Sequence, residues 1–495
     1  MHKRIFLWVC LLAAALSVRA NDLQWPSEAY AIWGLRQDFP PQTSVVSWSD
    51  WLVFFNANNR EPGVRMVLNE MAASGIRTVW WRTFGGGHAL YSSQVDGVTT
   101  GNYAGQGADY STFNSLAEAV KYAHKLGITV YAWYTPLEEA HGWSKNVRSV
   151  YTDAHPELTD YDYAGNAMST PSMYYPVYRA YKLALGKEML ETGVDGMVID
   201  FERKGAPGRT DNWGYVPALV DEFNKKYART GRPSQKDPDF IKFRAGFVGQ
   251  FMREMAAATH ERGKKFIVMY QYPTKGVCAH HDVPAWYKEG FVDQISVTNG
   301  WPFDSVTPAV LKDVTDTFGQ KPWPIQYAFF GTNQERLAQG RLLASAGTPD
   351  IVWFETTYMH SDNKYAVPRE LACEDACALT SPEYDFAKGG TLHVSGAVNW
   401  ELSLNGKVLA KGQSGKGYLV TVPAGSGKGA LVIKGRVPAN STAAGVGLWG
   451  EAVGADGKAV TVLTGRDWQV DKGTLATVGV MGVPPFLAPF DKEVR

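Results

Sequence analysis

Seven short apolar runs along the chain each come after a glycine that ends a stretch of helical periodicity. Glycine readily takes the left-handed conformation that closes a helix, so a strand can begin soon after it. The runs span residues 76–81, 128–133, 194–201, 264–270, 294–297, 324–329 and 350–354. The glycines are Gly75, Gly127, Gly193, Gly263, Gly290, Gly319 and Gly347. With the run 51–55 placed first, the pattern predicts eight strands that alternate with helices.

The runs are almost continuously apolar, as expected for strands of a parallel sheet that is buried on both faces. Between the first two runs, Val64, Val67, Leu68 and Met71 form one helical stripe. Eight such units predict an α/β fold, a (β/α)8 TIM barrel, over residues 21–388. A doubly wound open sheet is the alternative, although no glycine-rich nucleotide loop follows the first run.

Residues 389–495 follow a different pattern. The short apolar segments 391–394, 400–406, 418–422 and 430–433 are separated by Gly, Asn and Pro turns, with no helix-length pattern between them. This pattern predicts a C-terminal all-β sandwich domain. The stretch before it, near 361–388, shows no regular pattern.

The N-terminus is typical of an export signal. His2-Lys3-Arg4 precedes an apolar run over 5–16, and Val18-Arg19-Ala20 has the small-residue spacing of a cleavage site. We therefore expect residues 1–20 to be a signal peptide and the protein to be secreted or periplasmic. The run is too short to span a bilayer, so we expect no membrane insertion after the signal is removed.

The amino-acid composition limits the classes of molecule that the protein is expected to bind. Removal of residues 1–20 leaves 46 basic against 49 acidic residues, a balance that does not favour nucleic acid as a partner. Aromatic residues make up 13% of the chain, which is consistent with a large core and also with a cleft that stacks sugar rings. Cys373 and Cys377 are close enough to form a disulfide or to remain free. No Cys/His spacing is typical of zinc, so we expect no metal and no cofactor.

Active sites of such barrels lie where the strands end. Polar and aromatic residues near the ends of the predicted strands are Asn56, Arg82, His88, Tyr134, Glu138, Glu139, Asp200, Glu202, Arg203, Tyr270, Gln271, Asn299, Asp304, Gln326, Tyr327 and Glu355. Asp200 and Glu202 are two apart on strand four, so they point to the same face. Like charges at close range drive two pKa values apart, which is the division of labour that glycosidic cleavage requires.

We therefore predict Asp200, Glu202 and Glu355 as catalytic carboxylates of a glycoside hydrolase. An ion pair of Asp200 or Glu202 with Arg203 at the rim is the structural alternative. The residues predicted to bind substrate are Trp81, Arg82, His88, Tyr134, Arg203, Tyr270, Gln271, Asn299 and Gln326. The predicted partner is a carbohydrate substrate.

Three resemblances bear on these residues. Asp195-Gly-Met-Val-Ile-Asp200-Phe-Glu202 resembles the strand-four motif of family 18 chitinases, Asp-Gly-x-Asp-x-Asp-x-Glu, with Val198 in place of one acid. The resemblance implies that Glu202 is the general acid and that Asp200 positions an N-acetyl group. His155-Pro-Glu, the run 175–179 and the run 194–200 together resemble the bacterial glycosyl-hydrolase-like family 10 barrels, which implies a secreted glycoside hydrolase.

The third resemblance concerns the C-terminal region. Its Trp400-Glu-Leu-Ser-Leu-Asn-Gly-Lys407 is similar to the galactose-binding-like sandwiches of secreted glycosidases, followed here by Val422-Pro423. This implies an accessory domain, either sugar-binding or a structural cap on the barrel. For the whole chain, the alternatives to hydrolysis are a non-catalytic glycan-binding barrel and another exported carbohydrate enzyme, a deacetylase or lyase.

Overall fold

A computed structural model describes most of the chain. It covers residues 30–47, 60–100, 109–139, 149–200, 213–272, 282–299, 305–328, 331–361, 364–438, 441, 443–464, 467–472, 474–479 and 490–494. The predicted signal peptide, the run 51–55 and the site residues Glu202 and Arg203 lie outside these ranges, as do Asn56 and Asp304.

Eight parallel strands form a closed barrel in the order β10-β11-β12-β13-β2-β3-β6-β9. They are β2 (Gln42–Val46), β3 (Thr78–Arg82), β6 (Thr129–Tyr134), β9 (Gly196–Ile199), β10 (Lys265–Tyr272), β11 (Gln294–Asn299), β12 (Trp323–Tyr327) and β13 (Ile351–Phe354). The predicted TIM-barrel architecture is confirmed, and the open sheet is excluded. Seven of the strands coincide with the predicted runs, and all seven predicted glycines have positive φ.

Helices follow each barrel strand. They are α3 (Arg60–Ala73), α4 (Ser115–Lys125), α6 (Pro176–Glu191), α8 (Pro238–His260), α9 (Val283–Lys288), α10 (Pro308–Phe318), α11 (Asn333–Ser345), α12 (Thr356–Ser361) and α13 (Ala366–Ala372). The stripe of Val64, Val67, Leu68 and Met71 on α3 is buried as predicted. None of the helices in the described ranges is long and apolar enough to cross a membrane.

The first barrel strand is not the predicted run 51–55. It is β2, which pairs with β13 on one side and β3 on the other. Three of its five residues are polar, so its sequence does not look like a buried strand. Gln42 and Ser44 are nevertheless buried because Gln42 Nε2 donates to the Pro368 carbonyl (3.0 Å) and Ser44 Oγ lies 3.2 Å from Thr356 Oγ1.

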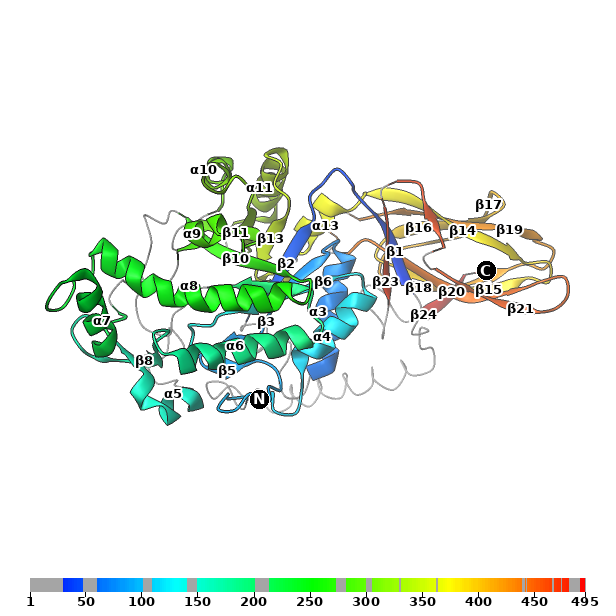
Figure 1. The fold of residues 1–495 in the computed structure, drawn as a ribbon. Coiled ribbons are helices and arrows are strands. Elements are labelled where there is room, and N and C mark those ends of the chain that lie inside the picture. Colours follow the sequence, from blue (N-terminus) through cyan, green and yellow to red (C-terminus); the bar gives the residue numbers. More distant parts are fainter. Residues whose placement is uncertain are drawn as a thin grey trace, which may run out of the picture.

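Smaller elements surround the strand ends. They are β4 (Phe84–Gly85), β5 (His88–Ala89), α5 (Val150–Ala154), the 3-10 helix η2 (Pro156–Leu158), β7 (Thr159–Tyr161), β8 (Ala167–Pro171) and α7 (Pro217–Tyr227). In Figure 1, α7 and the first half of α8 extend beyond the barrel on the side away from the C-terminal sheets. A separate aromatic core, with Tyr215, Phe223 and Phe240 at its centre, holds this extension together.

Two further sheets lie outside the barrel, and most of their strands follow it in sequence. One has the order β23-β1-β20-β15-β18-β24, with β21 beside β20, and the other has the order β17-β16-β19-β14-β22. The strands are β1 (Tyr30–Leu35), β14 (Ala376–Asp385), β15 (Gly390–Gly396), β16 (Asn399–Leu404), β17 (Lys407–Gly412), β18 (Gly417–Val422), β19 (Lys428–Arg436), β20 (Val446–Val453), β21 (Ala459–Leu463), β22 (Gln469–Val470), β23 (Thr474–Gly479) and β24 (Phe490–Val494). The four strand segments predicted after residue 389 are present, mostly in antiparallel pairs.

The sheets begin earlier than the predicted boundary at residue 389. Strand β14 occupies part of the stretch that lacks a sequence pattern, and α13 precedes it. Strand β1, from the N-terminal side of the barrel, pairs with β20 and β23. The two regions are therefore interleaved in sequence rather than consecutive.

The C-terminal sheets meet the barrel at the N-terminal ends of its strands (Figure 1). Ala444 N donates to the carbonyl of Ala73 (2.9 Å), the last residue of α3, which leads into β3. Gly75, with φ of 85°, packs so closely there that a Cβ atom would lie 2.7 Å from Ala372 Cβ. Cys373 and Cys377 are both buried and are not joined by a disulfide, and burial raises the pKa of the Cys373 thiol to about 12. The opposite end of the barrel, where the strands terminate, faces away from these sheets.

Candidate functional site

The barrel interior is filled by alternate strand residues. Its apolar cluster includes Val45, Trp80, Trp133, Val198 and Phe354, each from a different strand. Because side chains alternate along a strand, Arg82 and Asp200 share the inward side with Trp80 and Val198. Both therefore stand at the C-terminal end of the interior, above the aromatic layer. This end of the barrel is the candidate active site.

Asp200 is bound to the aromatic layer. It is 1% exposed, and Trp133 Nε1 donates a hydrogen bond to its Oδ2 at 3.2 Å. The guanidinium of Arg82 lies over the same indole, 4.7 Å from the ring centroid. A cation gains electrostatic energy over the face of a tryptophan ring. Trp133 thus connects the predicted catalytic carboxylate to a positive charge on the neighbouring strand.

Arg82 is in turn held by Glu138, which follows β6. Arg82 Nη2 donates to Glu138 Oε2, and Arg82 Nε donates to the Phe84 carbonyl at 3.1 Å. The side chains are 1% and 2% exposed. Burial of two charges is costly unless they are paired with good geometry. The result is a connected series at the mouth: Glu138, Arg82, Trp133 and Asp200.

Glu139, the next residue, points the other way. It forms an ion pair with Lys182 on α6, and both side chains are fully buried. Tyr178 OH donates to Glu139 Oε1 at 3.3 Å, and Lys182 Nζ lies 3.8 Å from the centroid of the Phe84 ring. Desolvation lowers the pKa of Lys182, and Glu139 opposes that shift. This pair lies between the barrel and its helices.

His88 lies on β5, beside the mouth. Its Nδ1 is 2.7 Å from the Gly86 carbonyl, and its side chain is buried. Burial lowers the pKa of His88, while the Gly86 carbonyl and the charge of Glu139 partly oppose the change. A neutral imidazole is therefore favoured at neutral pH.

The other predicted site residues differ in whether their side chains face the barrel interior or the surrounding helices. Trp81, Tyr134, Tyr270 and Gln326 have the helix-facing parity. Tyr134 OH donates to the Lys182 carbonyl at 3.0 Å, and the Tyr270 ring packs edge-on against Phe318 of α10. The structure does not bring these four together with Asp200.

Three further residues lie at the strand ends. Gln271 has the inward parity and is partly exposed at the end of β10. Asn299 Nδ2 donates to the Ser305 carbonyl at 3.0 Å, which fixes the chain before α10. Glu355 directly follows the inward-facing Phe354 and is 6% exposed, and its carbonyl accepts from Tyr358 N and Met359 N at the start of α12. Phe354 packs edge-on against Trp133, with ring centroids 5.7 Å apart.

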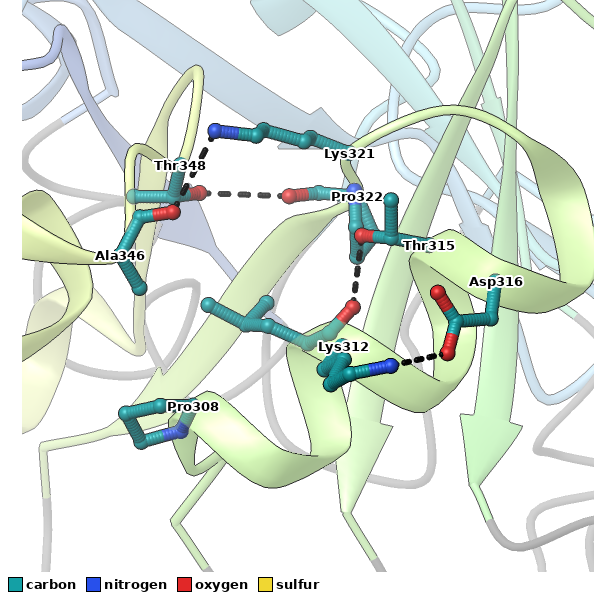
Figure 2. Close-up of a pocket in the computed structure, with 9 residues that line it drawn as sticks. Pro308, Lys312, Thr315, Asp316, Lys321, Pro322, Ala346 and Thr348 are labelled. Carbon is teal, nitrogen blue, oxygen red and sulfur yellow. Dashed lines mark hydrogen bonds and ion pairs between the residues drawn. The ribbon is translucent and has the colours of Figure 1, made fainter.

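A hollow on the outer surface is a poor candidate for the site. Figure 2 shows it between α10 and the residues that precede β12 and β13. Its polar groups already have partners: Lys321 Nζ donates to Ala346 O (3.3 Å), Thr348 Oγ1 to Pro322 O (3.2 Å), and Lys312 pairs with Asp316 (2.5 Å). It also borders Lys321, Pro322 and Thr348, which precede β12 and β13, and not the residues at the C-terminal ends of these strands. We interpret this hollow as a packing gap between α10 and the loops before β12 and β13.

The described residues contain no group of three His, Cys, Asp or Glu side chains arranged to hold a metal ion. The site residue that sequence reasoning underweighted is Glu138. Its pairing with Arg82 depends on how the chain turns after β6, and no residue spacing reveals that turn. The inward parity of Arg82, Trp133 and Asp200 was, by contrast, readable from the sequence.

The chain matches no protein-family model and no curated protein sequence. Among solved structures, it is similar to the glycoside hydrolase domain of PgaB (BpsB) from Bordetella bronchiseptica, with 10% identity and a TM-score of 0.48, covering 66% of this chain and 98% of that one. A β-amylase catalytic domain from Paenibacillus polymyxa has 10% identity and a TM-score of 0.44, with coverages of 67% and 95%.

The glycoside hydrolase domain of PelA from Pseudomonas aeruginosa has 13% identity and a TM-score of 0.33, covering 63% of this chain and 94% of that one. At these identities the similarity concerns the fold alone. The resemblances of the strand-four segment to family 18 and to the glycosyl-hydrolase-like family 10 barrels therefore stay predictions.

Proposed function

We propose that this protein is an exported glycoside hydrolase that cleaves glycosidic bonds at the mouth of its barrel. One observation carries the proposal: Asp200 is buried at the inward end of strand four, bound to Trp133, which also lies under the Arg82 guanidinium. Buried ionisable groups at the active end of a barrel are costly unless they serve a purpose. A carboxylate, an indole and a guanidinium are the groups that bind sugar rings and their hydroxyls.

Hydrolysis of a glycosidic bond needs two carboxyl groups, one as acid and one as base or nucleophile. We assign one role to Asp200. Glu202, two residues further on, and Glu355, at the end of β13, are the candidates for the other. Carboxyl groups about 5–5.5 Å apart would retain the anomeric configuration, and a separation of about 6.5–9.5 Å would invert it.

Substrate binding in this proposal uses the inward groups near Asp200. Arg82 and Gln271 supply hydrogen-bond donors, and His88 stands beside the mouth. Arg203 remains a candidate from the sequence. The predicted residues Trp81, Tyr134, Tyr270, Asn299 and Gln326 are not included, because their strand positions face the helices.

We also propose that the two C-terminal sheets form a β-sandwich that caps the barrel. Buried residues of both sheets, among them Leu392, Leu402, Ile433 and Leu448, belong to one hydrophobic cluster. The junction at the N-terminal ends of the strands favours the capping role over a second wall for the active site. Export rests on the N-terminal sequence pattern.

Replacement of Asp200 tests the proposal. Asp200→Asn keeps the shape and the hydrogen bond from Trp133, and we expect hydrolysis of the native glycan to fall about 10²–10⁴-fold. Asp195→Asn is the matched control, because Asp195 lies at the other end of the same strand, bonded to His124 and to Val130 N. Activity should be identified on a polysaccharide panel, with products analysed by NMR.

The proposal fails if Asp200→Asn keeps full activity while folding normally. Sugar binding without turnover across the panel would instead support a non-catalytic glycan-binding barrel. Loss of activity on chelation would support a metal-dependent enzyme such as a deacetylase.

A further inference from the structure

A second hollow, of about 280 Å³, lies between the helix-facing side of β12 and helix α11. Its walls include Gln326, Tyr327, Trp353, Glu335, Arg336 and Gln339. Gln326 and Trp353 reach it from neighbouring barrel strands, which pair through this register. The hollow is thus near the C-terminal end of the strands but outside the barrel interior that holds Asp200.

Gln326 is the unusual wall residue. It is 3% exposed, and its Nε2 atom has no hydrogen-bond partner in the described part of the chain. Buried amides normally have partners, and an unpaired one that faces a cavity calls for an explanation. The expected explanation is a ligand that accepts a hydrogen bond from Nε2.

Two other strand glutamines show how such residues are usually satisfied. Gln42 Nε2 donates to the Pro368 carbonyl (3.0 Å), while its Oε1 accepts from Trp353 Nε1 (2.8 Å). Gln294 Nε2 donates to the carbonyls of Ile295 (2.9 Å) and Lys321 (3.0 Å). Gln326 is buried to a comparable degree without this support, so its amide is not explained by packing of the fold.

Three other polar side chains of the wall are each bonded to the surrounding fold. Arg336 Nη2 donates to the Ala328 carbonyl at 2.6 Å, and Gln339 Nε2 donates to the Val306 carbonyl at 2.6 Å. Glu335 Oε2 accepts from Thr332 N (2.7 Å) and Thr332 Oγ1 (2.9 Å). Glu335 and Arg336 carry opposite charges, so the wall has no net charge that would select an ion.

We propose that this hollow is a second, non-catalytic binding site for one neutral sugar unit, anchored by the side-chain amide of Gln326. A primary amide donates through nitrogen and accepts through oxygen, which matches hydroxyl groups that do both. The volume lies at the small end of ligand sites, close to the size of a single ring rather than a chain. The choice of a sugar rests on the proposed glycan hydrolysis.

Binding to the full chain tests this site. Glucose, galactose and N-acetylglucosamine, each as the free monosaccharide, should be titrated and followed by ligand-observed NMR. We expect at least one to bind, and Gln326→Leu to weaken it by at least about tenfold. Asp200→Asn, which alters the barrel mouth, should leave that binding unchanged.

Stability without sugar gives an independent readout. Gln42→Leu breaks two hydrogen bonds and should lower Tm, whereas Gln326→Leu removes an unpaired amide and should leave Tm unchanged or higher. A lowered Tm for Gln326→Leu would overturn the proposal, as would sugar binding that survives this substitution or no sugar binding by the unmodified protein.

The two proposals fail separately. If hydrolysis depends on Asp200 but sugar binding does not depend on Gln326, the proposed enzyme activity stands and the proposed second site is wrong. If sugar binding depends on Gln326 but the protein has no hydrolytic activity, the second site stands and the proposed hydrolase function is wrong.

Discussion

Glu138 and Glu139 are adjacent in sequence, and each forms a buried ion pair, but the pairs lie on opposite sides of β6. Glu138 holds Arg82 at the barrel mouth, above the indole that binds Asp200. Glu139 holds Lys182 behind the strand, among Tyr178 and other aromatic rings of the helix layer. The same side chain, one residue apart, therefore has a different neighbourhood and a different expected role.

The comparison teaches that burial and pairing do not by themselves identify a functional acid. Both glutamates are buried, and both have a cation. What separates them is the next contact: Arg82 reaches the predicted catalytic group through Trp133, whereas Lys182 is enclosed by rings. We expect Glu138 to position the site and Glu139 to stabilise the fold.

The largest effect is expected at the enclosed pair. Lys182→Met leaves Glu139 buried without its cation, and we expect a loss of about 3–5 kcal/mol in the free energy of unfolding. The double variant Lys182→Met/Glu139→Gln should recover most of that loss, because no charge stays behind. Denaturant unfolding of the three proteins measures both. If the double variant were as unstable as the single one, packing rather than charge would explain the loss.

The next effect separates the two glutamates by activity. Glu138→Gln and Glu139→Gln each break a buried pair, so both should lower Tm. Only Glu138→Gln should also lower kcat, by about 100-fold with little change in KM, because misplacing a group by about 1 Å costs that much. Steady-state kinetics on the identified glycan decides the matter. Equal kcat values for the two variants would remove the distinction between the pairs.

A third buried carboxylate sharpens the comparison, because none of the described lysines and arginines pairs with it. Asp350 is 3% exposed at the start of β13, and burial raises its pKa well above the usual range. The folded form thus holds a proton that the unfolded chain releases above about pH 3.8, so this group makes stability fall as pH rises. We expect Asp350→Asn to stabilise the protein by about 1–2 kcal/mol at neutral pH.

Thermal unfolding across pH checks this sign. The advantage of Asp350→Asn should shrink as pH falls through 3.8, because the carboxyl group is protonated in both states well below that pH. An advantage that is the same at every pH would mean that the substitution acts through packing.

The smallest effect concerns His88. Burial lowers the pKa of His88, so below about pH 6.5 the unfolded chain binds a proton more readily than the folded protein. The folded protein therefore becomes less stable as the pH decreases. His88→Gln should therefore lose less Tm between about pH 6.5 and 5 than the unmodified protein. Glu139→Gln should lower the His88 pKa further, because the glutamate charge opposes the shift. A reversed effect of Glu139→Gln would show that its charge does not reach His88.

Much of the barrel could be predicted because its signals are local. A glycine that ends a helix and an apolar run that follows it depend on a few neighbouring residues. Strand β2 escaped this rule because its polar side chains are satisfied by Pro368 and Thr356, more than 300 residues away in sequence. Strand β1 escaped it for the same reason, since Ile32 pairs with Val446.

The site was predictable in part. Alternation along β3, β6 and β9 places Arg82, Trp133 and Asp200 on one side, and the same rule assigns Trp81 and Tyr134 to the other. The opposite directions of Glu138 and Glu139 depend on a turn after β6 and on partners from β3 and α6. Those contacts arise only when the barrel closes, so no spacing in the sequence encodes them.

The placement of β1 has a consequence for how the molecule is made. During synthesis this strand appears before any barrel strand, yet the strands on either side of it, β20 and β23, follow more than 400 residues later. Its backbone edges must stay unpaired, or shielded by a chaperone, until the barrel is complete. Once β20 and β23 pair with β1, an N-terminal strand and C-terminal strands hold each other in one sheet. Release of either side would weaken that sheet, which lies at the N-terminal end of the barrel strands.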